Sequence, residues 1–279
     1  MAKITSYRLK QVFKDGKVRR TELEAEMVAK LEEFHVSANA KKAALTAIRR
    51  HLDEIEGEAQ FLQDLCDNAK TGIWDSTKSK KWFVGRNFQE WGSCVKAEPK
   101  NIIIADGKSK IAITIDHIIG LDLNRFFLAP FKEDGKSGCI PASIANLKYI
   151  TSLDMCFNFL VGSIPTNIYK LAGLKTLKLE FNQLNGKIPS NFKKLTNLTY
   201  LALDHNRFEG NISMLASLTN LTYLNIHENK LSLSKTTMET LAGFEHLDHC
   251  WFYNNSSYTP EPGSKVEYNI QHKDWKAKE

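Results

Sequence analysis

The sequence predicts an α/β solenoid of stacked supersecondary units, preceded by an N-terminal α-helical segment. Apolar residues recur at one spacing from Leu147 to Leu233, an asparagine closes each unit, and the unit returns every 23 or 24 residues. A fixed period in the twenties is typical of stacked repeats, because one unit of that length cannot bury its apolar face alone. The stack also predicts a class of function, since a wide solenoid surface usually binds another macromolecule.

Each unit is expected to contain one short strand that faces a shared core. In Leu177-Lys178-Leu179 the alternation directs both leucines inward and the lysine outward. The asparagine that follows turns the chain, and its amide can satisfy backbone groups that the turn leaves open. The strands of stacked units then pair in parallel. The four regular units are Leu147, Ile150, Leu153, Met155 and Asn158; Leu171, Leu174, Leu177, Leu179 and Asn182; Leu195, Leu198, Leu201, Leu203 and Asn206; and Leu218, Leu221, Leu224, Ile226 and Asn229.

A second motif follows the asparagine. Gly-x-Ile-Pro occupies 162–165 and 186–189, an earlier copy occupies 138–141, and the copy at 210–213 lacks only the proline. This combination resembles the plant-type class of leucine-rich repeats. The resemblance implies parallel strands on a concave face, and it implies that this face contacts the partners.

The outward positions beside the core leucines are therefore the predicted partner-binding residues. Aromatic side chains alternate there with charged ones, which is the composition of a binding surface. Simple stacking of neighbouring tyrosines is the competing interpretation. The predicted set is Asp154, Phe157, Thr176, Lys178, Glu180, Phe181, Tyr200, Asp204, His205, Tyr223, Asn225, His227, Glu228, His249, Trp251 and Tyr253.

The solenoid is expected to span 118–255 with about six strands. Ile118, Leu121 and Leu123 give an irregular first strand, followed by an insertion over 128–137. A sixth strand is expected between Phe244 and Asn255. Terminal repeats are usually atypical because they cap the exposed core.

Residues 1–71 predict helices. A short helix is expected from Tyr7 to Lys14, and Thr21-x-x-Glu24 forms a capping box before a second helix. Ser37 is expected to cap a third, whose apolar positions alternate by three and four residues. That stripe suits an intramolecular helical hairpin or a short coiled coil with a partner helix. The apolar positions are Leu45, Ile48, Leu52, Ile55, Ala59, Leu62 and Leu65.

Two further segments complete the domain organisation. Residues 72–117 predict a cap region whose β-hairpin has strands over 102–104 and 111–115 and a turn at 105–108. Trp74, Trp82 and Trp91 are expected to cover the open end of the solenoid. Residues 256–279 predict a polar C-terminal arm that docks or stays mobile.

Composition and charge limit the classes of partner that the protein is expected to bind. The net charge is +6, and residues 1–50 hold twelve Lys or Arg against six Asp or Glu, which suits an acidic surface. No RNA-binding module is recognisable, so nucleic acid is not favoured as a partner. No apolar run approaches the roughly 18 residues that span a bilayer. The predicted partners are therefore one or more proteins, without membrane insertion.

The sequence contains opposing indications of the cellular compartment in which the protein resides. The start of the chain has no apolar signal region. Trp91-Gly92-Ser93-Cys94 resembles half of the cysteine pair that caps secreted plant-type repeats, but its upstream partner is missing. This favours a reducing compartment and a cytoplasmic, even cytoskeleton-associated, protein. Sequons headed by Asn197, Asn211, Asn220, Asn254 and Asn255 favour secretion instead.

The sequence does not predict an enzyme. Phosphate-loop, GxSxG and HExxH motifs are all missing. His205, His227 and His249 lie on successive strands but in different columns, so neither a metal site nor a cofactor is expected. The predicted function is a non-enzymatic interaction module or scaffold, as a subunit of an intracellular assembly. The alternatives are a secreted plant-type recognition or inhibitor protein, a cytoskeletal or ciliary component, and a regulatory subunit of an enzyme.

Overall fold

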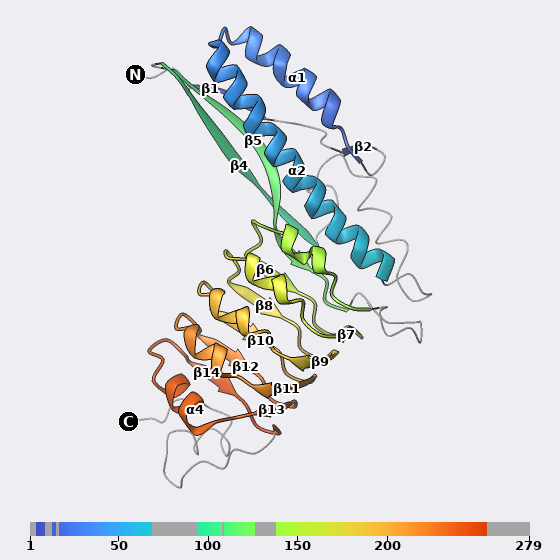
Figure 1. Ribbon diagram of the computed structural model, residues 1–279, viewed down its shortest axis with the longest axis vertical. Helices are drawn as coiled ribbons and strands as arrows, with labels where there is room; N and C mark the ends of the chain where they lie inside the picture. Colours follow the sequence, from blue (N-terminus) through green and yellow to red (C-terminus); the bar gives the residue numbers. More distant parts are fainter. Residues whose placement is uncertain are drawn as a thin grey trace. The chain divides into compact units, whose positions relative to one another are not determined.

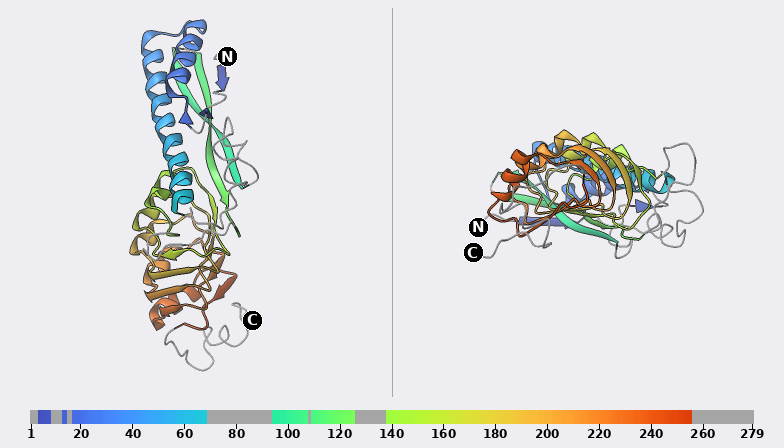
Figure 2. Two further views of the ribbon diagram at one scale, coloured as in Figure 1. Left: turned by 90° about the vertical axis from the view of Figure 1, so that its right-hand side faces the viewer. Right: turned by 90° about the horizontal axis from the view of Figure 1, so that it is seen from below.

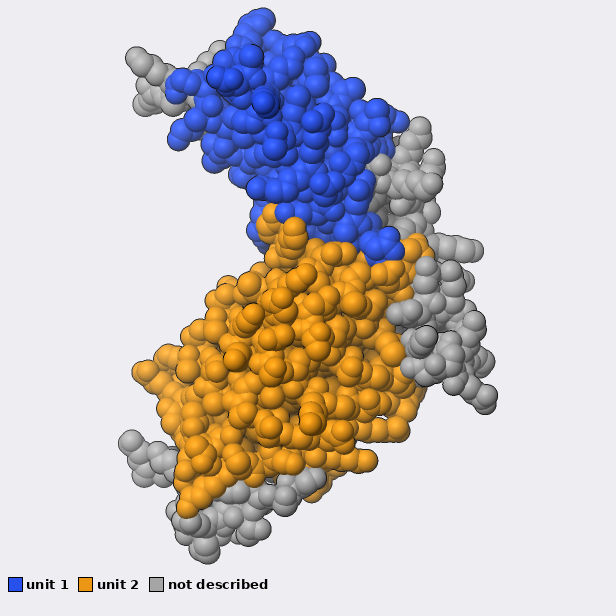
Figure 3. Space-filling view, viewed as in Figure 1, with its two compact units in different colours: residues 1–60, 76–120 blue, residues 61–75, 121–279 orange. Residues whose placement is uncertain are grey.

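The computed structural model describes residues 4–8, 13–14, 17–68, 94–107, 109–125 and 138–255. Two compact units divide the chain, as Figure 3 shows. The first comprises residues 1–60 and 76–120, and the second comprises 61–75 and 121–279. The predicted insertion over 128–137, the tryptophans Trp74, Trp82 and Trp91 and the C-terminal arm over 256–279 lie outside the described residues.

The first unit combines two helices with paired long strands (Figure 1). Helix α1 covers Arg20–Glu33 and helix α2 covers Ala38–Asn68. Strand β4 (Val95–Asp106) pairs with β5 (Ser109–Asp122), and Gly107 turns the chain between them at a φ of 57°. The predicted hairpin is therefore present, with strands much longer than expected.

Helices α1 and α2 run antiparallel within the chain. Arg20 at the start of α1 pairs with Glu56 (3.1 Å), while Glu32 near its end pairs with Lys41 (2.6 Å). Exposed pairs of this kind contribute little, so burial of the facing apolar stripes supplies most of the stabilisation. Because the stripe of α2 is already buried, the structure gives no support to the coiled coil with a partner helix. The buried residues of the two stripes include Leu23, Met27, Leu31, Ile48, Leu52 and Ile55.

The start of helix α1 differs from the prediction, whereas the predicted cap of helix α2 is present. The capping-box prediction is wrong: α1 begins at Arg20, its cap residue Arg19 makes no side-chain cap bond, and Glu24 pairs with Arg49 at 3.0 Å. The Ser37 cap is confirmed, since its Oγ accepts from the Ala40 N–H (3.2 Å). Ser37 also donates its hydroxyl to Asp106 at the end of β4 (2.6 Å), which links the cap to the strands.

The predicted helix from Tyr7 to Lys14 is wrong. Residues Ile4–Arg8 form strand β1, which pairs in parallel with β5, and β2 (Phe13–Lys14) pairs antiparallel with β3 (Lys17–Val18). β-branched and aromatic side chains at Ile4, Thr5 and Tyr7 suit a strand once a partner strand is available.

The second unit is the predicted solenoid. Its main sheet has the order β6-β8-β10-β12-β14, and each neighbouring pair of these strands is parallel. The strands are β6 (Ser152–Asp154), β8 (Thr176–Lys178), β10 (Tyr200–Ala202), β12 (Tyr223–Asn225) and β14 (His249–Trp251). The residues predicted as an irregular first strand form the end of β5 and the turn after it.

A second sheet was not predicted. It has the order β13-β11-β9-β7 and comes from the segments that follow each asparagine. These strands are β7 (Val161–Gly162), β9 (Gln183–Lys187), β11 (Arg207–Asn211) and β13 (Lys230–Ser232). Gly162, Gly186 and Gly210 adopt φ values of 72–79°, a left-handed conformation that explains the glycine of the repeat motif.

Short helices complete each repeat on the side opposite the main sheet (Figure 2). They are the 3-10 helices η2 (Ala142–Asn146), η3 (Thr166–Lys170), η4 (Ser190–Lys194) and η5 (Ser213–Ser217), with α4 (Lys235–Ala242) in the last repeat. The leucines of the motif are buried between the two sides, as predicted.

Buried asparagines join successive repeats. The Nδ2 of Asn206 donates to the carbonyls of Leu203 (3.1 Å) and Asp204 (3.1 Å) in its own repeat and of Leu179 (2.9 Å) in the preceding one. Its Oδ1 accepts from the N–H of Leu184 (2.9 Å). We call this series the asparagine ladder, and its members are Asn158, Asn182, Asn206, Asn229 and Asn255.

Replacing Asn206 with alanine is expected to lower the free energy of unfolding by about 3 kcal/mol, because the buried backbone groups that it satisfies lose their partner. Asn220→Ala is the matched control, since this exposed amide makes one bond to the Thr196 carbonyl (2.7 Å), and its loss should cost about 1 kcal/mol. Urea denaturation measures both values. Equal losses would contradict a special role for the ladder.

Candidate partner-binding surface

The outward residues of the main sheet form four columns, because the parallel strands align equivalent positions. Pairing of β6, β8, β10, β12 and β14 sets this register directly. The columns are Ser152, Thr176, Tyr200, Tyr223 and His249; Asp154, Lys178, Ala202, Asn225 and Trp251; Cys156, Glu180, Asp204, His227 and Tyr253; and Phe157, Phe181, His205, Glu228 and Asn254.

The fourth column has an unusual backbone conformation. Phe157, Phe181, His205, Glu228 and Asn254 all adopt φ values of 51–54°. A non-glycine residue in this region costs about 1–2 kcal/mol, and hydrogen bonds to the next repeat hold it there. Phe181, for example, donates its N–H to the Asp204 carbonyl (3.1 Å). The conformation projects each side chain at the edge of the concave face.

Aromatic rings from the third and fourth columns stack in a continuous series. Phe157 lies on Phe181 with ring centroids 4.3 Å apart, and Phe181 lies on His205 at 4.0 Å. His205 meets His227 edge-on at 4.8 Å, and His227 stacks on Tyr253 at 4.3 Å. We call these five side chains the aromatic row. Both phenylalanines remain 38% exposed, which leaves apolar surface for a partner.

A second aromatic group occupies the first two columns. Tyr200 and Tyr223 stack in parallel at 4.0 Å, and Trp251 meets Tyr223 edge-on at 5.3 Å. His249 lies 5.9 Å from each of Tyr223 and Trp251. We call Tyr200, Tyr223, His249 and Trp251 the tyrosine cluster. The stacking that the sequence offered as a competing interpretation is therefore real, yet His249 is exposed and the other three are only half-buried.

Charged groups lie between the two aromatic groups. Lys178 forms an ion pair with Asp154 (3.3 Å), and its ammonium lies 5.5 Å from the Tyr200 ring centroid. Burial lowers the pKa of Lys178, but Asp154 and Glu180 outweigh that effect and raise it. The lysine is therefore firmly cationic at neutral pH.

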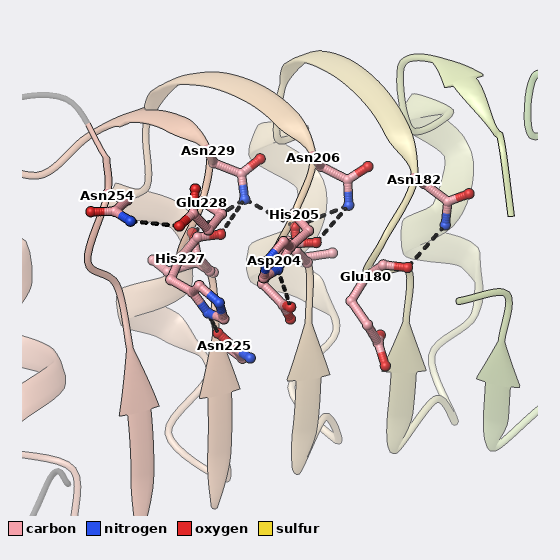
Figure 4. Close-up of polar contacts among 12 residues, drawn as sticks. Glu180, Asn182, Asp204, His205, Asn206, Asn225, His227, Glu228, Asn229 and Asn254 are labelled. Carbon is pink, nitrogen blue, oxygen red and sulfur yellow. Dashed lines mark hydrogen bonds and ion pairs between the residues drawn. The ribbon is translucent and has the colours of Figure 1, made fainter. Parts of the chain in front are cut away.

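Glu180 and Asp204 are neighbours whose carboxylates are partly shut off from water. Glu180 Oε2 and Asp204 Oδ1 are both buried and have no hydrogen-bond partner in the described part of the chain. Burial, followed by repulsion from Asp204 and Asp154, raises the pKa of Glu180 from 4.5 to about 7. Figure 4 shows these side chains projecting from neighbouring strands on the same side of the sheet as His205, Asn225 and His227.

The structure brings together two of the three histidines considered from the sequence. Ligand atoms of Asp204, His205 and His227 lie within 4.8 Å of one another, while His249 belongs to the tyrosine cluster. Asp204 Oδ2 lies 3.0 Å from His205 Nδ1, and His227 Nδ1 is hydrogen-bonded to Asn225. These contacts orient both rings within the aromatic row.

The predicted partner-binding residues differ in how much of each side chain is exposed to solvent. Asp204, Asn225 and His227 are only 3–7% exposed, so they support their neighbours more than they offer free surface. Sequence reasoning missed Arg125, whose guanidinium lies 4.9 Å from the Phe157 ring centroid, and Phe159, which is 45% exposed. Neither falls in the strand motif, so no repeat position identified them.

A family model for the leucine rich repeat matches residues 148–208, which include three ladder asparagines and three of the five main strands. The chain belongs to the leucine-rich repeat family. Its sheet and repeat motif are those of the plant-type class, and no curated protein sequence matches it significantly. Such repeats are typically non-catalytic, protein-binding modules.

Several solved structures are similar to this chain. A chain of the BIR3–SERK2 complex from Arabidopsis thaliana is 33% identical, with a TM-score of 0.43 over 52% of this chain and 72% of that chain. The BIR2 ectodomain from Arabidopsis thaliana is 22% identical, with a TM-score of 0.49 over 75% and 95%. A plant ice-binding protein is 23% identical, with a TM-score of 0.50 over 70% and 56%.

No helix in the described part of the leucine-rich repeat protein combines the length and apolarity that crossing a membrane requires.

The raised pKa of Glu180 predicts a pH-dependent stability. Between pH 4.5 and about 7 the folded protein keeps a proton that the unfolded chain loses, so the free energy of unfolding falls as pH rises through this window. Glu180→Gln cannot ionise, so it should remove that fall and be more stable than the native protein above pH 7. Thermal denaturation across this pH range measures the difference. Glu209→Gln, at an exposed position outside the four columns, is the control; a fall that persists in Glu180→Gln would contradict the assignment.

Proposed function

We propose that this protein is a non-enzymatic recognition module that binds a protein or an extended peptide on its concave face. The observation that carries the proposal is the pairing of the aromatic row and the tyrosine cluster across five parallel strands. Rings fixed by stacking lose little conformational entropy when a partner covers them, which is why aromatic side chains dominate binding energy at interfaces.

Charge on the same face supports a peptide-like partner. Lys178, at the end of β8, lies beside the tyrosine cluster, and Glu180, two residues further along the chain, directly precedes Phe181 of the aromatic row. A lysine and a glutamate at these positions can bind groups of opposite charge on a partner, and so determine in which direction the partner chain runs across the face. Backbone and side-chain amides of a peptide suit such a mixed surface better than a purely apolar ligand does.

Combined replacement of Tyr223 and Trp251 by alanine is expected to weaken partner binding strongly. Each hot-spot aromatic contributes about 2 kcal/mol or more, so a loss of at least ~100-fold is expected for the pair. Affinity capture with the tagged full-length chain and mass spectrometry identifies the partner, and titration with the purified partner then measures the loss.

Tyr169→Ala is the matched control for this experiment. Tyr169 lies in η3 on the opposite side of the repeats, where the Lys194 ammonium lies 4.4 Å from its ring centroid. Binding that survives the concave double variant but fails with Tyr169→Ala would overturn the proposed surface.

Two candidate functions follow from this proposal, and they differ in the cellular compartment in which the protein binds its partner. The sequence predicts a cytoplasmic subunit of an intracellular assembly, and a cytoskeletal component or an enzyme's regulatory subunit are forms of it that partner identity would distinguish. The second candidate is an extracellular recognition protein. Three sequon asparagines with exposed side chains, Asn197, Asn211 and Asn220, favour it. The Nδ2 of Asn197 and that of Asn220 each donate to a single backbone carbonyl (2.8 and 2.7 Å), so glycosylation needs only one exposed bond to open.

The five sequons provide a sharp test of the extracellular candidate. In a secreted protein, glycans are expected on exposed Asn197, Asn211 and Asn220 but not on Asn255, whose Nδ2 donates to the carbonyls of Ile226 and Phe252 (both 2.9 Å). Glycopeptide mass spectrometry of protein from its own cells measures occupancy. Unmodified asparagines at all three exposed sites, together with a stoichiometric intracellular partner, would support the cytoplasmic candidate.

A further inference from the structure

A second group of titratable side chains lies in the first unit, between α2 and β5. His51, Glu54 and Glu58 follow one another on α2 at steps of three and four residues, which places them on one helix face. His117 comes from β5. The side chains of His117 and Glu58 are fully buried, and those of His51 and Glu54 are 7% and 8% exposed. Groups of this kind are buried only when they are hydrogen-bonded, paired or bound to a metal.

Three ligand atoms converge at this point. His51 Nδ1 lies 2.8 Å from His117 Nε2 and 3.3 Å from Glu54 Oε2. One ligand atom from each of these residues lies within 4.8 Å of the others. In a tetrahedral zinc site with bonds of about 2.1 Å, neighbouring ligand atoms are roughly 3.4 Å apart. The three atoms are therefore close to the spacing that a shared ion requires, and small side-chain movements would admit it.

Glu58 orients the His117 ring so that one of its nitrogens can bind an ion. His117 Nδ1 donates to Glu58 Oε1 (2.8 Å), and Glu58 Oε2 accepts from the Ile118 N–H (3.1 Å). This contact fixes the tautomer of His117, so its Nε2 lone pair points toward His51 and Glu54. A carboxylate behind a histidine in this way is the usual support of a metal-binding imidazole.

His51 can exchange one tautomer for the other when an ion binds. Its Nδ1 proton is donated to His117 Nε2, and its Nε2 faces an Arg50 guanidinium nitrogen at 3.3 Å. Coordination through Nδ1 moves the proton to Nε2, which then stops accepting from Arg50. Since Arg50 is exposed, its head group can turn into solvent.

We propose that His51, Glu54 and His117 bind a divalent transition-metal ion, with Glu58 as a positioning residue. Two imidazoles and one carboxylate are a ligand set that zinc favours, and water or the second Glu54 oxygen can complete four ligands. The ion joins α2 to β5 and so stabilises the first unit. This site is independent of the concave face and of the proposed partner binding.

Zinc titration of the chelator-treated full-length protein tests the proposal. Calorimetry is expected to show one high-affinity zinc ion per chain, and cobalt substitution should give the intense visible absorption of a tetrahedral site. His51→Gln and Glu54→Gln should each weaken zinc binding at least 100-fold. Glu58→Gln should weaken it by about 10–100-fold, as loss of an outer carboxylate does. Far-UV circular dichroism confirms that each variant is folded.

Two controls separate this site from other histidines. The double variant His205→Gln, His227→Gln removes the concave Asp204 group and should leave the high-affinity site unchanged. Arg50→Gln removes the donor that holds His51 in the competing tautomer, so it should bind zinc at least as tightly as the native chain. If His51→Gln fails to fold, Glu54→Gln and Arg50→Gln decide the result. Absence of zinc binding, or binding lost only in the concave double variant, would overturn the proposal.

Discussion

The asparagine ladder is the interaction on which the repeat surface depends. Each amide binds carbonyls in two adjacent repeats, and Asn182, Asn206, Asn229 and Asn255 also accept an N–H from the preceding repeat. The ladder therefore holds successive repeats in register at the spacing that strand pairing sets. That spacing sets the distance between side chains of one column. Ring centroids 4.0–4.3 Å apart in the aromatic row and the tyrosine cluster follow from it, because equivalent positions in adjacent strands are close enough to stack. The binding surface is therefore a consequence of the scaffold's own buried polar bonds.

The residue before each ladder asparagine shows how the scaffold holds an unfavourable conformation. Its left-handed backbone is retained in five successive repeats, with phenylalanine, histidine and glutamate tolerated where glycine would be easier. Cross-repeat hydrogen bonds such as Phe157 N–H to the Glu180 carbonyl (3.1 Å) offset the strain. Because the backbone and not the side chain determines this geometry, the position is free to vary chemically. It can hold a contact residue without any loss of the repeat.

Local sequence patterns predict the structure of each repeat, but they do not predict which segments distant in the sequence pair with one another. The leucine and asparagine spacing predicted the parallel sheet, the ladder and sixteen of the twenty positions in the four columns; Ser152, Cys156, Ala202 and Asn254 were not in the predicted set. It did not predict β1, because the strand that pairs with Ile4 lies at Lys110 and no short-range pattern reveals that partner. Periodicity also gave no sign that Asp204, Asn225 and His227 are covered by their neighbours, since burial on a strand face depends on the size of the adjacent side chains. Apolar spacing predicts the stripe of α2, but it does not indicate that His51 and Glu58 are also buried on that helix.

The asparagine ladder and the buried histidine–glutamate group of the first unit satisfy their polar atoms in chemically different ways. In the repeats, amides bind backbone carbonyls, and because neither group titrates, the ladder holds its geometry across the pH range. In the first unit, imidazoles and carboxylates bind one another, so the contacts depend on which nitrogen carries each proton. Apolar residues could occupy this core without that dependence, as they do at neighbouring Leu52 and Ile55. Side chains that could exchange these hydrogen bonds for coordination fit the proposed ion, which would add a link between α2 and β5 that apolar packing alone does not supply.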